Sequence, residues 1–182
     1  MAHRLSNSYL ADSVAIFRQY KGLAERAIAQ VADSDLVRPI DAESDSIAQV
    51  VKHLAGNMRS RWRDFLTSDG EKPDRHRDSE FTDPPATRAE ILKMWEEGWA
   101  LVFAALEPLT EEDLGRTITI RGEAHSVMQA INRQIAHYSY HTGQIVMLAK
   151  YFAGDRWKSL TIPRGKSGEF LKRVLTGEAS QR

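Results

Sequence analysis

Four long stretches of the sequence place apolar residues every three or four positions, the spacing that lines one face of an α-helix. The stretches run from Ser6 to Ala32, from Ser46 to Gly70, from Thr87 to Pro108 and from Ser126 to Gly154. Ser46 and Gln49 have the spacing of a capping box at a helix start, and Thr87 and Glu90 repeat it. Because an amphipathic helix must bury its apolar face against another element, the pattern predicts an all-α four-helix bundle.

The segments outside these helices differ in composition. Residues 69–86 contain three prolines and many charged side chains, so we expect a long charged loop without regular structure. Thr117–Ile120 alternates Thr and Ile and leads into Arg121-Gly122, a turn signal, which predicts a small β-hairpin before the last long helix. Residues 155–182 form a C-terminal tail with a short helix near its end.

The apolar stripes also predict how the core is filled. Gly98 lies between Trp95 and Val102 on the third stripe, where the missing side chain lets another helix approach closely. Aromatic residues on the helices are expected in the core rather than in a pocket. They are Trp62, Trp95, Trp99, Tyr138 and Tyr140.

Length and charge restrict the class of protein. The 182 residues suit one domain, which we place over 1–182. The 25 Lys and Arg residues balance 25 Asp and Glu residues, which argues against a nucleic-acid partner held by phosphate contacts. No apolar run reaches the roughly 18 residues of a membrane span or has the form of a signal peptide. We therefore expect a cytoplasmic protein with a small-molecule substrate and no membrane partner.

Histidines are the candidate metal ligands of this sequence. There is no cysteine, so disulfides, thiolate ligands and a cysteine nucleophile are excluded. His137 and His141 are four residues apart and project from nearly the same face of one helix, a spacing that suits two ligands of one ion. His53 in the second helix is the natural third ligand, and His125 is its nearest competitor. The alternative is that these histidines bind no metal and only form hydrogen bonds.

The residues from His137 to Ile145, His-Tyr-Ser-Tyr-His-Thr-Gly-Gln-Ile, resemble the H-x-x-x-H-x-G-Q-I signature of the DinB/YfiT-like superfamily of metalloenzymes. His53 matches the first ligand of that family, and the order of elements agrees over most of the chain. The resemblance implies a divalent ion, nickel or zinc, bound by His53, His137 and His141, in a protein that is often a homodimer. It also implies a choice of reactions, because some members transfer low-molecular-weight thiols such as bacillithiol or mycothiol and others are presumed hydrolases.

Three functions are therefore compatible with the sequence. Three neutral imidazoles leave a divalent ion an open position that lowers the pKa of a bound water to about 7, or ionises an external thiol. We expect a metal-dependent transferase that uses a low-molecular-weight thiol as cosubstrate. A metal-dependent hydrolase at the same site is the second hypothesis, and a non-catalytic, metal-stabilised interaction module is the third. No catalytic side chain is assigned.

Four polar residues are candidates for binding the substrate. Asn57 and Arg61 lie one and two turns beyond His53 on the same helix, so they are placed at the mouth of the site. Arg75 and Arg77 in the charged loop would suit a carboxylate or phosphate on the substrate. The alternative for this loop is a solvated segment held by its own salt bridges.

Overall fold

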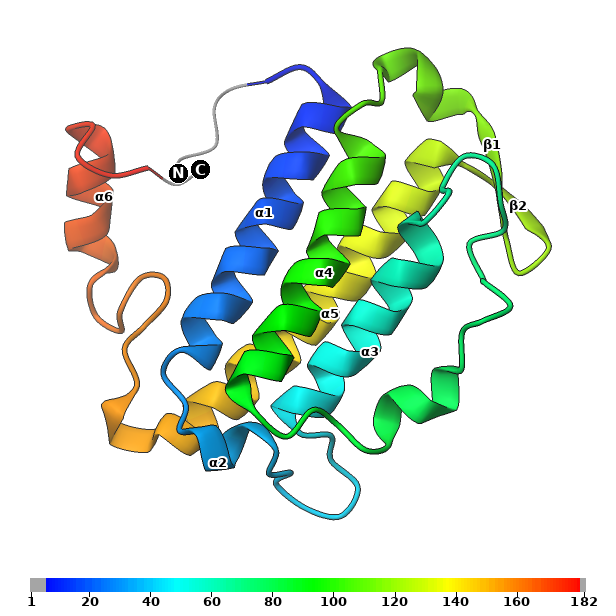
Figure 1. Ribbon diagram of the computed structural model, residues 1–182. Helices are drawn as coiled ribbons and strands as arrows, with labels where there is room; N and C mark the ends of the chain where they lie inside the picture. Colours follow the sequence, from blue (N-terminus) through cyan, green and yellow to red (C-terminus); the bar gives the residue numbers. More distant parts are fainter. Residues whose placement is uncertain (1–5, 181–182) are drawn as a thin grey trace.

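The computed structural model describes residues 6–180, and four long helices lie alongside one another in it (Figure 1). They are α1 (Tyr9–Ile28), α3 (Ile47–Trp62), α4 (Arg88–Leu106) and α5 (Val127–Ala153). The all-α four-helix bundle is confirmed. The ends of the expected 1–182 domain, residues 1–5 and 181–182, lie outside the described residues.

Shorter elements connect the four helices. They are α2 (Asp33–Leu36), the 3-10 helices η1 (Arg77–Phe81), η2 (Glu111–Gly115) and η3 (Gly154–Arg156), the strands β1 (Thr117–Ile120) and β2 (Glu123–Ser126), and α6 (Ser167–Leu175). The helix α6 confirms the short helix expected in the C-terminal tail. Within residues 6–180, no helix is both long enough and apolar enough to cross a membrane.

Side-chain caps start the helices where the sequence indicates. The hydroxyl of Ser46 accepts a hydrogen bond from the backbone of Gln49, whose side chain accepts one in return from the backbone of Ser46. Thr87 and Glu90 form the same capping box at the start of α4. Each box satisfies backbone N–H groups that have no partner within the helix. The capping boxes therefore set the first residue of α3 and of α4.

One aromatic residue from each long helix meets at the centre of the bundle. Phe17 of α1 lies 6.1 Å from Trp62 of α3, 6.0 Å from Trp99 of α4 and 5.7 Å from Tyr138 of α5, measured between ring centroids. Tilted and edge-to-face rings of this kind are favourable because the positive edge of one ring meets the negative face of another. Trp62, Trp95, Trp99 and Tyr138 are all buried, as expected.

Tyr140 is the exception among the aromatic residues predicted to be in the core. Its relative exposure is 64%, and its ring packs against His141 with a centroid distance of 4.9 Å. Two positions along an α-helix correspond to a rotation of about 200°. Tyr140 therefore points out of the bundle core, because Tyr138 points into it.

The helix α3, the second of the four long helices, is shorter than its apolar stripe indicates. The helix α3 ends at Trp62, and Asp64 has φ of 50°, which breaks the helical path. Phe65 is nevertheless buried and lies 4.8 Å from Trp62 between ring centroids. A turn can bury Phe65 as well as another helical turn would, so apolar spacing alone extended the prediction too far.

The predicted hairpin is present and is fastened to the charged loop. Strands β1 and β2 pair antiparallel, and the turn residues Arg121 and Gly122 both have positive φ, 57° and 78°. The Asp69 carboxylate accepts hydrogen bonds from both turn N–H groups, each at 2.8 Å. The backbone N–H of Gly70 donates to the carbonyl of Thr119 at 2.7 Å. The first residues of the loop are thus fixed against the hairpin.

The close approach expected at Gly98 is confirmed. A Cβ added there would lie 2.9 Å from the Met58 sulfur and 3.2 Å from the Ala55 Cα, both on α3. A Cβ added at Gly143, a helical glycine on α5, would meet no described atom within 4 Å beyond its two chain neighbours and the backbone of its own helix. Close packing of α3 on α4 therefore depends on Gly98.

These two glycines make a matched pair for a stability test. We expect Gly98→Ala to lower the free energy of unfolding by about 1–3 kcal/mol, because the backbone of α3 must shift. Gly143→Ala should raise it by up to about 1 kcal/mol through helix propensity alone. Urea unfolding followed by circular dichroism measures both. Equal effects of the two substitutions would show that α3 and α4 do not meet closely at Gly98.

Candidate metal centre

The bundle brings together three histidines from two helices. His53 lies on α3, and His137 and His141 lie one turn apart on α5. One ring nitrogen from each lies within 4.8 Å of the others, and this is the combination that the sequence predicts. His125 lies in strand β2 outside this group, with its Nδ1 3.0 Å from the carbonyl oxygen of Glu123.

The spacing of the imidazoles fits a shared ion. The Nε2 atoms of His53 and His137 are 3.4 Å apart. Two ligands of a tetrahedral ion with metal–nitrogen bonds of about 2.0–2.1 Å are about 3.3–3.4 Å apart. His137 Nδ1 is buried without a hydrogen-bond partner among the described residues. The nitrogen donors thus suit a divalent transition-metal ion, and the pair from His53 and His137 has the spacing of two of its ligands.

A carboxylate from the charged loop orients His53. Glu80 Oε2 lies 2.8 Å from His53 Nδ1, so Nδ1 carries the proton and the lone pair of Nε2 faces the other two histidines. His53 is buried, with a relative exposure of 4%. Carboxylates commonly fix the tautomer and rotation of a metal-binding imidazole in this way.

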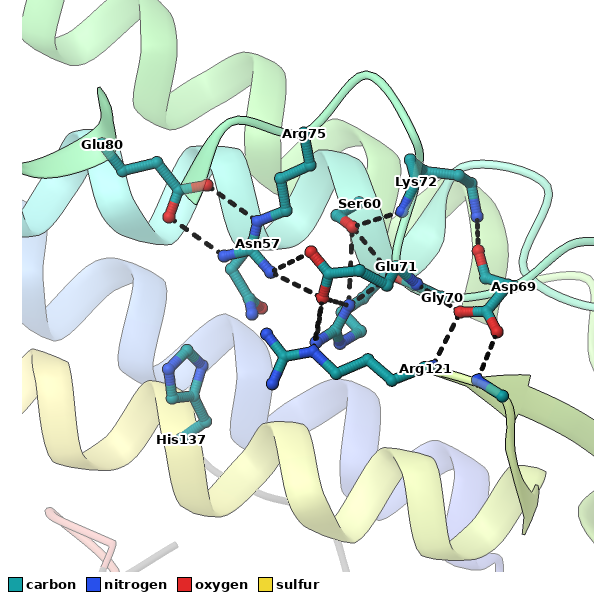
Figure 2. A network of polar contacts seen from close by, with 12 residues as sticks. Asn57, Ser60, Asp69, Gly70, Glu71, Lys72, Arg75, Glu80, Arg121 and His137 are labelled. Atoms are coloured by element: carbon teal, nitrogen blue, oxygen red, sulfur yellow. Dashed lines mark hydrogen bonds and ion pairs between the residues drawn. The ribbon is translucent and has the colours of Figure 1, made fainter. Parts of the chain in front are cut away.

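The loop around Glu80 is more ordered than the sequence indicates. Residues 77–81 form the 3-10 helix η1, which corrects the expectation of no regular structure between 69 and 86. Arg75 donates to both carboxylate oxygens of Glu80, at 2.8 and 3.0 Å (Figure 2). The ring of Phe81 stacks on His53 with centroids 4.9 Å apart. A Cβ at Gly56 would lie 2.7 Å from the Glu80 carboxyl carbon, so this glycine leaves room for the carboxylate against α3.

His141 is oriented from within its own helix. Its Nδ1 lies 2.6 Å from the amide oxygen of Gln144, one turn later. Because that oxygen can only accept, Nδ1 carries the proton and Nε2 keeps its lone pair. His53 and His141 are therefore both held as the tautomer that offers Nε2 to a metal.

Burial keeps the two imidazoles on α5 neutral. It lowers the pKa of His137 to about 3, and the positive charge on nearby groups, His141 first, adds to the effect. Burial is also the main reason that the pKa of His141 is lowered. Burial raises the pKa of Glu80, but its hydrogen bonds from His53 and Arg75 outweigh that effect, so the net pKa lies below the usual value. Neutral imidazoles beside an ionised Glu80 are the state that binds a metal.

A pocket of about 400 Å³ opens beside the histidines. All four residues expected to bind a substrate line it, together with the three histidines. The lining residues are His53, Asn57, Arg61, Arg75, Arg77, Phe81, Arg121, Arg133, Gln134, His137, Tyr140 and His141. The sequence therefore predicts both the histidines and part of the pocket wall.

The four predicted substrate residues differ in their contacts. Asn57 Oδ1 accepts a hydrogen bond from the Tyr138 hydroxyl at 3.1 Å, which leaves its amide NH₂ group as a donor. Arg61 is buried and donates to the carbonyl of Gly70 and to Glu71. The guanidinium of Arg75 is bonded to Glu80. Arg77 is largely exposed and lies over the Phe81 ring, 5.3 Å from its centroid.

Several residues of the site were not predicted from sequence. Gln144 lies three positions after His141, within the signature, so the helical spacing provided a signal for its contact. Glu80 had no such signal, because 27 residues and a loop separate it from His53. Arg121 and Arg133 reach the pocket from the hairpin turn and from α5. Glu80, Arg121 and Arg133 reach the site only when the chain folds.

Comparisons with known proteins identify the family and the fold of the chain. Residues 4–166 match the family described as "Protein of unknown function (DUF1572)". The chain belongs to this family. No curated protein matches this DUF1572 chain.

A solved structure shares the fold of this DUF1572 protein. It is YfiT from Bacillus subtilis, described as a probable metal-dependent hydrolase with an unusual four-helix bundle topology. The TM-score is 0.60 at 20% sequence identity, over 83% of this chain and 91% of that one. At this identity the likeness shows a shared fold, and it is the four-helix bundle that the sequence resemblance implies.

The hydrogen bond between Glu80 and His53 makes a direct prediction about metal affinity. We expect Glu80→Gln to weaken zinc binding by about 10- to 100-fold, because the imidazole loses the anion that orients it. Asp78→Asn is the matched control, since Asp78 also lies in η1 but its side chain is fully exposed. Competition with a chromophoric chelator measures both affinities, and circular dichroism checks the fold. The role of Glu80 is refuted if both variants bind zinc as tightly as the unmodified protein.

Proposed function

We propose that this protein is a metal-dependent enzyme that holds one divalent ion, nickel or zinc, on His53, His137 and His141. The observation that carries the proposal is the convergence of three buried or half-buried imidazoles, two of them with their Nδ1 atoms occupied by oxygen acceptors. Imidazole nitrogen suits both metals. A divalent ion on three neutral imidazoles keeps an open position and acidifies a water or thiol bound there.

The residues of the chain have separate tasks in this proposal. Glu80 holds His53 in its tautomer, and Arg75 holds Glu80. Asn57 presents its amide NH₂ group to the substrate, while Arg61 and Arg77 add positive charge to the pocket wall. The pocket beside the histidines supports an enzyme over a purely structural metal site, because structural sites are usually closed by a fourth protein ligand.

We further propose that the reaction is the transfer of a low-molecular-weight thiol. The chain has no cysteine, so a thiol nucleophile must come from a cosubstrate. Among the residues that line the pocket there is no Asp, Glu or Lys to act as a general base toward water. A thiol, whose free pKa is about 8.5, can be ionised by the metal ion without help from such a base.

A hydrolase is the second candidate. The printed description of YfiT, which shares this fold at 20% identity, supports it. Hydrolysis would use the same histidines and the same pocket, with water in place of the thiol. The two reactions differ in whether a thiol is required.

An assay with defined thiols distinguishes the candidates. Untagged, zinc- or nickel-loaded protein is incubated with bacillithiol, mycothiol or glutathione and a chlorinated bimane electrophile, and thioether formation is followed by fluorescence. We expect one thiol to react in the presence of the unmodified protein, and His141→Ala to lose at least about 100-fold of that rate, since a metal ligand is removed.

His125→Ala is the control, because it removes a histidine outside the group of three. It should retain both the rate and the metal content measured by elemental analysis. Equal rates for the unmodified protein and His141→Ala with every thiol would contradict thiol transfer. Metal-dependent cleavage of a nitrophenyl ester without any thiol would favour the hydrolase instead.

A further inference from the structure

Arginine is the dominant charged residue of the pocket beside the three histidines. Five arginines line it, and they come from α3, the charged loop, η1, the hairpin turn and α5. They are Arg61, Arg75, Arg77, Arg121 and Arg133. A pocket lined by one sign of charge concentrates ligands of the opposite sign.

Nearby carboxylates neutralise only part of this charge. Glu71 accepts hydrogen bonds from Arg61 and Arg121 and lies 3.4 Å from Arg75, which is also paired with Glu80 (Figure 2). Two carboxylates therefore pair with three arginines. The remaining two arginines of the pocket, Arg77 and Arg133, are not bonded to either carboxylate.

The contacts of Arg77 and Arg133 leave their charge available. Arg77 is 4.0 Å from Asp78, whose side chain is fully exposed to solvent, so this pair is weak. Arg133 is exposed on α5 and has no ion pair among the described residues. Both guanidiniums can therefore turn toward a ligand in the pocket without breaking a buried contact.

Arg121 is placed at the pocket by its backbone. It occupies a turn position with φ of 57°, and the Asp69 carboxylate holds its N–H at 2.8 Å. Its Nε donates to Glu71 at 2.9 Å, and its side chain extends from the hairpin to the region of His137 (Figure 2). The two terminal nitrogens of the guanidinium make no hydrogen bond to any described residue. The side chain is 52% exposed.

We infer that this pocket binds an acidic group of the substrate, a carboxylate or a phosphate, through Arg77, Arg121 and Arg133. The planar guanidinium forms paired hydrogen bonds with the oxygens of either group. Arg61 and Arg75 stay behind the binding position, since hydrogen bonds to Glu71 and Glu80 hold both of them in place. The inference rests on the proposed function for its reaction, in which it makes the cosubstrate an acidic thiol or its acceptor an acidic electrophile.

Binding of small anions tests the inference without any enzyme assay. Isothermal titration calorimetry at low ionic strength uses succinate and inorganic phosphate as probes, and succinamide as an uncharged analogue of succinate. The titrations are made with zinc-loaded protein and with protein stripped of metal by a chelator. We expect succinate or phosphate to bind in both states, and succinamide to bind in neither. The tighter of the two anions identifies the acidic group as a carboxylate or a phosphate.

Charge-neutral variants locate the binding position. Arg121→Gln and Arg133→Gln should each weaken anion binding by roughly three- to tenfold, because each removes charge-assisted hydrogen bonds at a partly exposed site. Arg164→Gln is the matched control, since Arg164 is exposed in the C-terminal tail and does not line the pocket. It should bind the anion as the unmodified protein does.

Any of the following results would overturn the inference. They are equal binding of succinate and succinamide, equal affinities in the Arg121→Gln, Arg133→Gln and Arg164→Gln variants, and anion binding that disappears with the metal. Stoichiometric zinc without anion binding would refute this inference and leave the metal site standing. Anion binding in a protein that takes up no zinc would support this inference and refute the metal site.

Discussion

A buried hydrogen-bonded chain between α3 and α5 is the contact on which the metal centre depends. The indole N–H of Trp62 donates to the Tyr138 hydroxyl at 2.8 Å, and that hydroxyl donates to Asn57 at 3.1 Å. A buried hydroxyl must be paired, so this chain restricts how α5 can rotate against α3. With Tyr138 held inward, the adjacent His137 faces His53 across the bundle. The core and the metal site are therefore two sides of one helix–helix contact.

The charged loop completes what the helices begin. It carries Glu80 to the buried face of His53, where an isolated carboxylate would be costly. Arg75 offsets that cost by pairing with both oxygens, and Glu71 in turn connects Arg75 with Arg61. The alternative of a solvated loop held by its own salt bridges is thus correct for the salt bridge between Arg75 and Glu80 but not for its solvation, because both side chains are buried. The same salt bridge orients a histidine. Structural and functional roles cannot be separated at these residues.

Helical periodicity predicted most of the fold and the pairing of His137 with His141, because both depend on local spacing. His53 was instead expected because it is the histidine of the second long stretch and matches the first ligand of the family that the sequence resembles. His137 and His141 are related by one helical turn, and the capping boxes at Ser46 and Thr87 fix where α3 and α4 begin. The same reasoning misplaced Tyr140 and extended α3 past Trp62, where burial and helical structure no longer coincide. Helical spacing could not place Glu80, Arg121 and Arg133 at the site, because their positions depend on how a loop and a hairpin fold over the bundle.

X-ray absorption spectroscopy of the untagged, zinc-loaded protein tests the central claim most directly. The account predicts one ion with three imidazole nitrogens at about 2.0–2.1 Å and a further light ligand, since the site offers three histidines and an open pocket. In His53→Ala the imidazole contribution should fall and the ion should no longer bind stoichiometrically. An identical spectrum and full occupancy in His53→Ala would contradict the claim that α3 and α5 share the metal.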